Sequence, residues 1–295
     1  MSQACEVQAR FFWPPPQLRR YFTTFYYVEV CCDRPFAQFD YLHPEWANFR
    51  IIDGCKPVAT NFRGDRAANT NFYVTGPSCK AVRFEFDGPI RMWGIGVLPL
   101  GWTKFVGLDA GAWADALVDG NDESEFAEFV PLAAQVYGEQ PDLDGELARI
   151  TQFFLDRVQR PVPDEDRVLA IHAALVDPEV DSVAELVDRA GVSNRTVERI
   201  CHRAFGFPPK LLLRRQRFLR SLAKYVLDPS LKWIGALDSQ YHDQAQFVKD
   251  FKQFMGMSPR QYAALDKPIL NAVMHARAQF AGKAVQGLDS PARGT

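Results

Sequence analysis

The sequence contains no long apolar run. No stretch of about 18 consecutive apolar residues occurs in its 295 positions, so a membrane-spanning helix is not expected. The segment Met1 to Arg10 contains Glu6 and Arg10, whereas a secretory signal peptide needs an uninterrupted apolar core. From these two absences we expect a cytoplasmic chain with no membrane partner.

The sequence also lacks the residue spacings that bind metal ions or support catalysis. The cysteines include no C-x-x-C pair and no matching histidine cluster, so no metal site is expected. Gly94-x-Gly96 lacks the third glycine of a dinucleotide-binding loop, and no nucleophile elbow or H-E-x-x-H motif occurs. We therefore expect no enzyme and no cofactor. We interpret five cysteines as small buried side chains and the five histidines as surface or packing residues: Cys5, Cys31, Cys32, Cys55, Cys79, and His43, His172, His202, His242, His275.

Positive charge is scarce in the first part of the chain and concentrated in a later segment. Residues 1–181 hold 16 Lys and Arg against 27 Asp and Glu, whereas residues 182–262 hold 14 against 7. A basic segment of this size suits a polyanion, and the acidic remainder limits indiscriminate binding to nucleic acid or anionic membrane. A solvated helix face is the alternative interpretation of the same charge.

Aromatic and β-branched residues dominate from Phe11 to Phe105 and are interrupted by proline and glycine at short intervals. This texture predicts antiparallel strands in a sandwich or small barrel. The segment 93–102 is interpreted as a buried strand followed by a bend, with pocket lining as the alternative. The expected strands are Thr23–Val30, Asn48–Ile52, Phe72–Thr75, Ala81–Phe86 and Met92–Leu98.

Helical periodicity replaces this pattern after Trp113. Amphipathic helices are predicted over Ala112–Leu117, Ser124–Val136 and Leu143–Val158. The short, charged, proline-bearing stretch 160–166 is interpreted as an interdomain linker, and the pattern beyond it is helical.

Two segments of the basic region repeat each other at an offset of 50 residues. A predicted helix cap is paired with a predicted helix cap, an apolar ridge with an apolar ridge, and the exit turns also align. The matched pairs are Ser193 with Asp243, Val197 with Phe247, Cys201 with Phe251, Phe205 with Met255, Gly206 with Gly256, and Pro209 with Pro259.

In each copy the early positions outside the apolar ridge are free to contact a partner. Arginine can donate two hydrogen bonds to guanine, glutamine can pair with adenine, and glutamate can accept from cytosine. A short helix at Val183–Leu186 and a turn at Ala190–Val192 precede the first copy, which is the order of a helix-turn-helix unit. The candidate DNA-binding residues are Asn194, Arg195, Thr196, Glu198, Arg199, Gln244, Ala245, Gln246 and Lys249.

A helix of about 20 residues, Pro208 to Leu227, is predicted between the two copies. It would span roughly 30 Å, close to one DNA turn of about 34 Å. Its basic residues are candidates for phosphate contacts, with solvated surface as the alternative for most of them: Lys210, Arg214, Arg215, Arg217, Arg220 and Lys224.

Over about 100 residues, Arg167 to Leu265, the chain resembles the AraC/XylS family of bacterial regulators. The resemblance is carried by Ser193–Arg199, by the exit 206–209 (Gly-Phe-Pro-Pro), by 241–252 (Tyr-His-Asp-Gln-Ala-Gln-Phe-Val-Lys-Asp-Phe-Lys) and by 256–262 (Gly-Met-Ser-Pro-Arg-Gln-Tyr). It implies two helix-turn-helix subdomains joined by a long helix that bind promoter DNA. The sequence departs from the family at 237–240, which lacks the usual glycine turn, and at Pro208, where serine is common.

These observations together predict an α+β protein that regulates transcription by sequence-specific binding to double-stranded promoter DNA. We expect a β-rich effector-binding domain at 1–110, a helical linker or dimerisation segment at 111–160, the AraC-type DNA-binding domain at 161–266, and a tail at 267–295. A small-molecule effector, RNA polymerase and a second copy of the chain are further candidate partners. The alternative is a small-molecule-sensing or protein-binding module whose DNA-binding units have degenerated.

Overall fold

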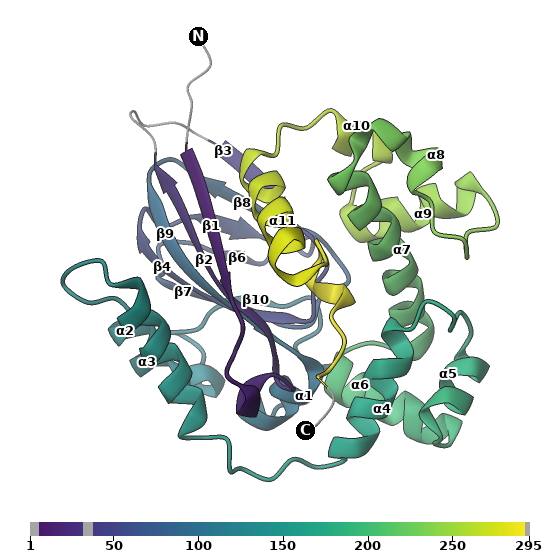
Figure 1. Cartoon of the computed structure of the whole chain (residues 1–295), viewed down its shortest axis with the longest axis horizontal. Helices are drawn as coiled ribbons and strands as arrows, with labels where there is room; N and C mark the ends of the chain where they lie inside the picture. Colours follow the sequence, from purple (N-terminus) through teal and green to yellow (C-terminus); the bar gives the residue numbers. More distant parts are fainter. Residues whose placement is uncertain (1–5, 32–37, 293–295) are drawn as a thin grey trace.

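The computed structural model describes residues 6–31 and 38–292, and Figure 1 shows a β-rich N-terminal part beside a helical C-terminal part. The expected α+β class is therefore confirmed. Cys5, Cys32 and the last three residues of the predicted tail lie outside the described ranges, so their interpretations are not tested. Within those ranges, no helix is both long enough and apolar enough to cross a membrane.

The larger sheet has six antiparallel strands in the order β1-β2-β9-β4-β7-β10. Alternation along its strands separates two cores: Ile51 packs on the face covered by helices, whereas Ile52 faces the second sheet. Both faces are thus covered, which explains why β2 and β9 are almost entirely buried. The strands are β1 (Glu6–Phe12), β2 (Phe22–Cys31), β9 (Ile90–Val97), β4 (Ala47–Gly54), β7 (Phe72–Thr75) and β10 (Leu117–Asp119).

The smaller sheet packs against the second face and has four strands in the order β3-β8-β5-β6. All five strands predicted from the sequence are present within one or two residues of their expected ends. The short or polar strands β1, β3, β5, β6 and β10 were not predicted. The bounds of this sheet are β3 (Gln38–Leu42), β8 (Val82–Phe86), β5 (Val58–Thr60) and β6 (Arg66–Ala67).

The glycine-rich end of β9 is a buried strand, as interpreted. A Cβ atom on Gly94 would lie 1.9 Å from Cζ of Tyr26, and one on Gly96 would lie 2.1 Å from Oγ1 of Thr23. Close packing between neighbouring strands therefore requires glycine at both positions. A bend follows at α1 (Pro99–Gly101) and a single π-helical turn at Trp102–Val106.

The segment after the π-helical turn is only partly helical. The helix predicted over Ala112–Leu117 is wrong, because these residues form turns that lead into β10, which pairs with β7 at the sheet edge. The next two predictions are confirmed: a 3₁₀ turn (Ser124–Phe129) continues into α2 (Val130–Gln135), and α3 (Leu143–Leu155) follows. Phe154 of α3 packs against Phe22 of β2 at a ring-centroid distance of 4.5 Å, so these helices cover the first face of the larger sheet.

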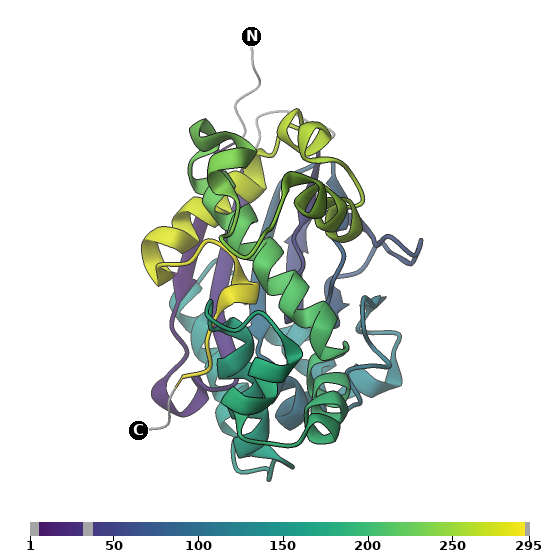
Figure 2. The same cartoon turned by 90° about the vertical axis from the view of Figure 1, so that its right-hand side faces the viewer.

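Helices α4–α10 form most of the helical C-terminal part, with α7 running between two groups of shorter helices (Figure 2). Helices α4–α6 lie at one end of α7 and α8–α10 at the other. Ser182 and Ser193 cap the starts of α5 and α6, and α7 begins at Pro209 and ends before Asp228. The helices are α4 (Glu165–Val176), α5 (Val183–Ala190), α6 (Asn194–Phe205), α7 (Pro209–Leu227), α8 (Lys232–Ala236), α9 (Gln244–Met255), α10 (Pro259–Ala263) and α11 (Pro268–Ala281).

The two parts of the chain share one continuous apolar core. Arg215 of α7 has no exposed surface; it donates to the backbone oxygens of Glu45 and Ser78 and lies 4.1 Å over the ring of Trp46. Its interpretation as a phosphate contact or solvated residue is therefore wrong. The predicted tail also belongs to the fold, because α11 packs on β1 and β3 and its Phe280 stacks near Phe11.

Candidate DNA-binding surface

Helix α6 begins and ends where its sequence predicts. The Ser193 hydroxyl accepts a hydrogen bond from the backbone N–H of Thr196 at 3.2 Å, and Gly206 ends the helix with a φ of 83°. Between these caps, Val197, Cys201 and Phe205 are buried. Because this ridge faces the core, the opposite face of α6 is left outside.

The predicted contact residues of α6 lie on that outer face. Asn194, Arg195, Glu198 and Arg199 are exposed, and Thr196 is half-buried with its hydroxyl 2.9 Å from that of Ser193. Ahead of α6, helix α5 has a complete capping box and ends at Gly191, whose φ is 65°. The first helix-turn-helix unit therefore has the predicted order and geometry.

Arg199 has a partner within the chain. Its Nη1 atom lies 2.9 Å from Oδ2 of Asp164, whose other oxygen pairs with Arg167 at 2.7 Å. Asp164 precedes α4 with a left-handed φ of 55°, which is uncommon for a residue other than glycine. The hydrogen bond from Arg199 holds the pKa of Asp164 below its usual value. In this conformation the carboxylate of Asp164, in the predicted linker, therefore pairs with the guanidinium of Arg199, a candidate base-reading residue.

Helix α9 repeats the construction of α6. Oδ1 of Asp243 accepts from the backbone N–H of Gln246 at 2.7 Å, and the ridge Phe247, Phe251 and Met255 is buried. Outside the ridge, Gln244, Ala245 and Lys249 are exposed, and Gln246 is half-buried with its amide oxygen accepting from the His242 backbone. The structure thus places all nine predicted residues on the outer faces of two equivalent helices.

The turn of the second unit differs from the first, as the missing glycine predicts. Helix α8 has five residues, and the buried Asp238 accepts from the Nε atom of Arg220 at 2.6 Å and from the backbone N–H of Gln240. The backbone N–H of Asp238 in turn donates to the Ser221 hydroxyl at 2.8 Å. Burial alone would raise the pKa of Asp238, but its pairing with Arg220 lowers it below the usual value. Side-chain hydrogen bonds here replace the glycine turn.

A second buried carboxylate fixes α9 to α7. Asp250 accepts from Arg214, from Arg217 at 3.0 Å and from the Tyr241 hydroxyl at 3.1 Å. Arg214, Arg217 and Arg220 are half-buried in ion pairs within the second unit and are not free surface charges, whereas Lys210 and Lys224 are exposed. The sequence signal that was missed is the pair of acids, Asp238 and Asp250, that these arginines neutralise.

A groove between α5, α7 and α9 brings several of these polar groups together. Lys249 and Gln246 of α9 line it beside Lys210 of α7, and the capped start of α5 at Ser182 forms its far wall. The groove therefore connects the two helix-turn-helix units on one side of α7.

Residues 186–264 match a family model described as a helix-turn-helix domain. This part of the chain is an AraC-type helix-turn-helix domain. The match covers α5 to α10, which includes both units and the helix between them. A comparison with curated proteins gives no match.

A comparison with solved structures gives matches to two regulators, ToxT and CuxR. ToxT from Vibrio cholerae is 12% identical with a TM-score of 0.45, covering 87% of this chain and 97% of its own. A ToxT structure with bound unsaturated fatty acid, from Vibrio cholerae strain SCE256, is 13% identical with a TM-score of 0.42, over 89% and 96% of the two chains. The AraC-like transcriptional activator CuxR is 12% identical with a TM-score of 0.29, over 74% and 96%.

The five histidines are surface or packing residues, as interpreted from the sequence. His43 and His172 are buried, whereas His202, His242 and His275 are exposed. Cys79 is buried, and its burial raises the pKa of the thiol to about 12, but Cys31 is exposed, so the buried interpretation of Cys31 is wrong. Among the described residues no group of three or more His, Cys, Asp or Glu side chains could hold a metal ion.

Proposed function

We propose that this chain is a transcription regulator that binds promoter DNA sequence-specifically through both units of its AraC-type domain. The proposal rests on the distribution of side chains around α6 and α9. Each helix buries its apolar ridge and exposes the polar positions that can read bases. Arg195, the second residue of α6, and Gln244, the first residue of α9, are the clearest base-reading candidates of the two units.

The helix between the units sets the spacing of the contacts. Helix α7 has 19 residues, which corresponds to a length of about 28 Å at 1.5 Å per residue. One DNA turn is about 34 Å long, so two recognition helices at the ends of such a strut suit two neighbouring major-groove segments. The proposal therefore includes two half-sites about one turn apart.

The N-terminal domain is the proposed regulatory part of the chain. Its two sheets enclose a pocket that α11, which follows the DNA-binding domain, helps to close. We propose boundaries of 1–110 for this domain, 111–160 for the segment between, and 161–266 for the DNA-binding domain. A cytoplasmic location, contact with RNA polymerase and self-association through 111–160 belong to the same proposal.

The second candidate function is a sensing or protein-binding module with degenerate DNA-binding units. It is favoured by the five-residue α8, by the turn without glycine and by the pairing of Arg199 with Asp164. Against it, Asp238 and its partners give the altered turn a full set of hydrogen bonds. The following experiment separates the two functions.

The test is selection of genomic DNA fragments by the purified full-length chain at two salt concentrations. The proposal predicts enrichment of a motif with two half-sites and weaker binding at the higher salt, because phosphate contacts release counterions. Arg195→Ala is expected to weaken selection, whereas Arg10→Ala, an exposed arginine on β1, serves as the matched control. Absence of any enriched motif would favour the second candidate.

A further inference from the structure

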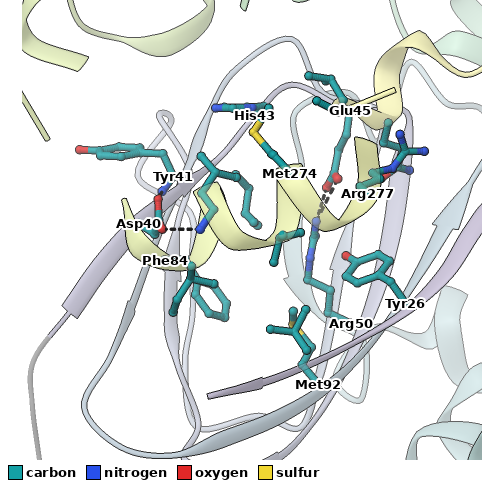
Figure 3. Close-up of a pocket in the computed structure, with 18 of the residues that line it drawn as sticks. Tyr26, Asp40, Tyr41, His43, Glu45, Arg50, Phe84, Met92, Met274 and Arg277 are labelled. Atoms are coloured by element: carbon teal, nitrogen blue, oxygen red, sulfur yellow. Dashed lines mark hydrogen bonds and ion pairs between the residues drawn. The ribbon is translucent and has the colours of Figure 1, made fainter. Parts of the chain in front are cut away.

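A pocket lies in the N-terminal domain between the two sheets and helix α11 (Figure 3). Its cavity volume is about 120 Å³, similar to cavities that hold a single six-membered ring. Apolar side chains make up most of the wall, including Val28, Phe84 and Met92 from the sheets and Val273 and Met274 from α11. An apolar ligand of that size would fill the cavity and make van der Waals contacts with its wall.

The charged groups in the wall already have partners. Glu45 receives two hydrogen bonds from Nη2 of Arg50, at 2.8 and 2.9 Å, and Arg277 pairs with Asp289. Asp40 accepts from the backbone N–H groups of Leu270 and Tyr41, both at 2.8 Å, and the nearby ammonium group of Lys267 offsets its negative charge. A ligand carrying a net charge would therefore meet no free counter-charge in a desolvated site, which is costly.

Two further features of the pocket wall narrow the chemical class of the ligand. Burial lowers the pKa of His43 to about 3, so this ring adds no positive charge to the pocket near neutral pH. Arg50 is only 3% exposed, and its Nε–H has no hydrogen-bond partner although the rest of its guanidinium is paired. Figure 3 shows Arg50 directed at Glu45, with Tyr26 and Met92 beside it. One buried donor in the wall is thus left without an acceptor.

We propose that this pocket binds an uncharged, largely apolar small molecule that carries a hydrogen-bond acceptor, and that α11 couples its binding to the second helix-turn-helix unit. The apolar wall selects the body of the ligand, the balanced charges exclude acids and amines, and Arg50 supplies the donor for an acceptor such as a carbonyl oxygen. The coupling rests on the proposed DNA-binding function; the ligand class does not.

The path from the pocket to the DNA-binding domain is short. Helix α11 forms one wall, and Asp40 from the β3 strand caps its first turn at Leu270. Immediately before α11, the buried Lys267 donates to the backbone oxygen of Tyr262 in α10 at 2.8 Å. His43, which also lines the pocket, lies 2.8 Å from the hydroxyl of the same Tyr262. Tyr262 packs on Phe251 of α9, so a shift of α11 reaches the recognition helix.

Four small aromatic probes of one skeleton test the ligand class without DNA. Acetophenone is neutral with an acceptor, ethylbenzene is neutral without one, and benzoate and benzylamine carry opposite charges. Ligand-observed NMR on the full-length chain should show acetophenone binding about threefold to tenfold tighter than ethylbenzene, and at least about tenfold tighter than both ions. Tighter binding of either ion, or no binding of either neutral probe at millimolar concentration, would overturn the ligand class.

A pair of tryptophan substitutions on α11 locates the binding. Val273→Trp fills the pocket and should abolish acetophenone binding, whereas Gln279→Trp adds the same bulk on the exposed face and should leave it unchanged. Circular dichroism confirms that both variants fold, and Ile269→Phe serves as a second filling variant if Val273→Trp does not. Equal binding by the filled and control variants would place the probe elsewhere and refute the site.

The coupling is measured on a DNA fragment that the chain selects. Saturating acetophenone should change the DNA dissociation constant of the wild type by at least about fivefold and leave that of Val273→Trp unchanged. No change in the wild type, despite probe binding, would refute the coupling alone. If no fragment is selected at all while the probes still bind, the DNA-binding function fails and the ligand class stands.

Discussion

Asp250 provides a sharp test of how the second helix-turn-helix unit is held in place. Its side chain is 2% exposed and accepts charge-assisted hydrogen bonds from Arg214 and Arg217 and a further one from Tyr241. In Asp250→Asn the shape is kept, but one carboxylate oxygen becomes an N–H₂ group facing donors that it cannot satisfy. The substitution also removes the negative charge between two arginines.

The expected loss follows from the burial of the three partners. Breaking a fully buried ion pair costs about 3–5 kcal/mol, and charge-assisted hydrogen bonds contribute about 1.5–3 kcal/mol each. Because the Arg214 and Arg217 side chains keep 30% and 12% of their exposure, water recovers part of this loss. We expect Asp250→Asn to lower the free energy of unfolding of this unit by about 2–4 kcal/mol.

The assay is urea unfolding followed by circular dichroism, with amide hydrogen exchange to localise the effect to α9 and α10. The matched control is Asp243→Asn, the same chemical change seven residues earlier, where asparagine caps a helix as well as aspartate does. The control should stay within about 0.5 kcal/mol of the wild type. Equal urea midpoints and equal exchange protection for Asp250→Asn and the control would show that the Asp250 carboxylate does not hold α9 to α7.

Three further predictions concern the core, the acid stability and the recognition face. Phe251→Ala should lower the free energy of unfolding by about 3–5 kcal/mol because the ring is fully buried, whereas the exposed Lys252→Ala should leave the melting temperature unchanged. Equal melting temperatures for the two variants would show that the helical register is wrong. His172 is buried between Trp46 and Phe205, and this burial lowers its pKa to about 3. Below about pH 6.5 the histidine is protonated in the unfolded chain but stays neutral in the folded chain. The free energy of unfolding therefore falls as the pH falls. Asp40, whose pKa burial raises to about 6, acts in the opposite direction between about pH 6 and 4. His172→Gln should therefore reduce the stability lost between pH 7 and pH 5 by about 2 kcal/mol in urea titrations, and an unchanged loss would contradict the assignment. Arg199→Ala should weaken specific DNA binding by about 1–3 kcal/mol. Asp164→Asn frees Arg199 from its ion pair and should tighten DNA binding up to about fivefold in fluorescence anisotropy, with the exposed Asp166→Asn as control. Weaker binding by Asp164→Asn would show that the ion pair does not compete with DNA.

The sequence predicts the elements whose signals are local. Periodicity and caps locate α5, α6, α7 and α9 because a capped amphipathic helix is specified by its own residues. The central strands β2, β4 and β9 are found for the same reason, since their aromatic and β-branched runs are long. The nine candidate contact residues follow from the helical register alone, and all of them lie on the outer faces of α6 and α9.

The features that were missed depend on residues far apart in the chain. Strand β10 is short and forms because it pairs with β7 at the edge of the larger sheet, and no pattern in its own residues predicts that pairing. The arginines of α7 look like free surface charge until α9 brings Asp250 beside two of them and Asp238 neutralises Arg220. The pocket needs three distant segments at once, namely β3, the larger sheet and α11.

The central claim, that both units read DNA, is tested most directly by measuring base preferences of two variants on a selected fragment. Every base pair of the fragment is varied in turn, and binding is compared for the wild type, Arg195→Ala and Gln244→Ala, with Arg10→Ala as control. If both units read DNA, each variant loses preference at its own base pair, and these positions lie about 10 base pairs apart in two half-sites. Uniform weakening at all positions, or loss confined to one half-site for both variants, would show that the two units do not each read bases.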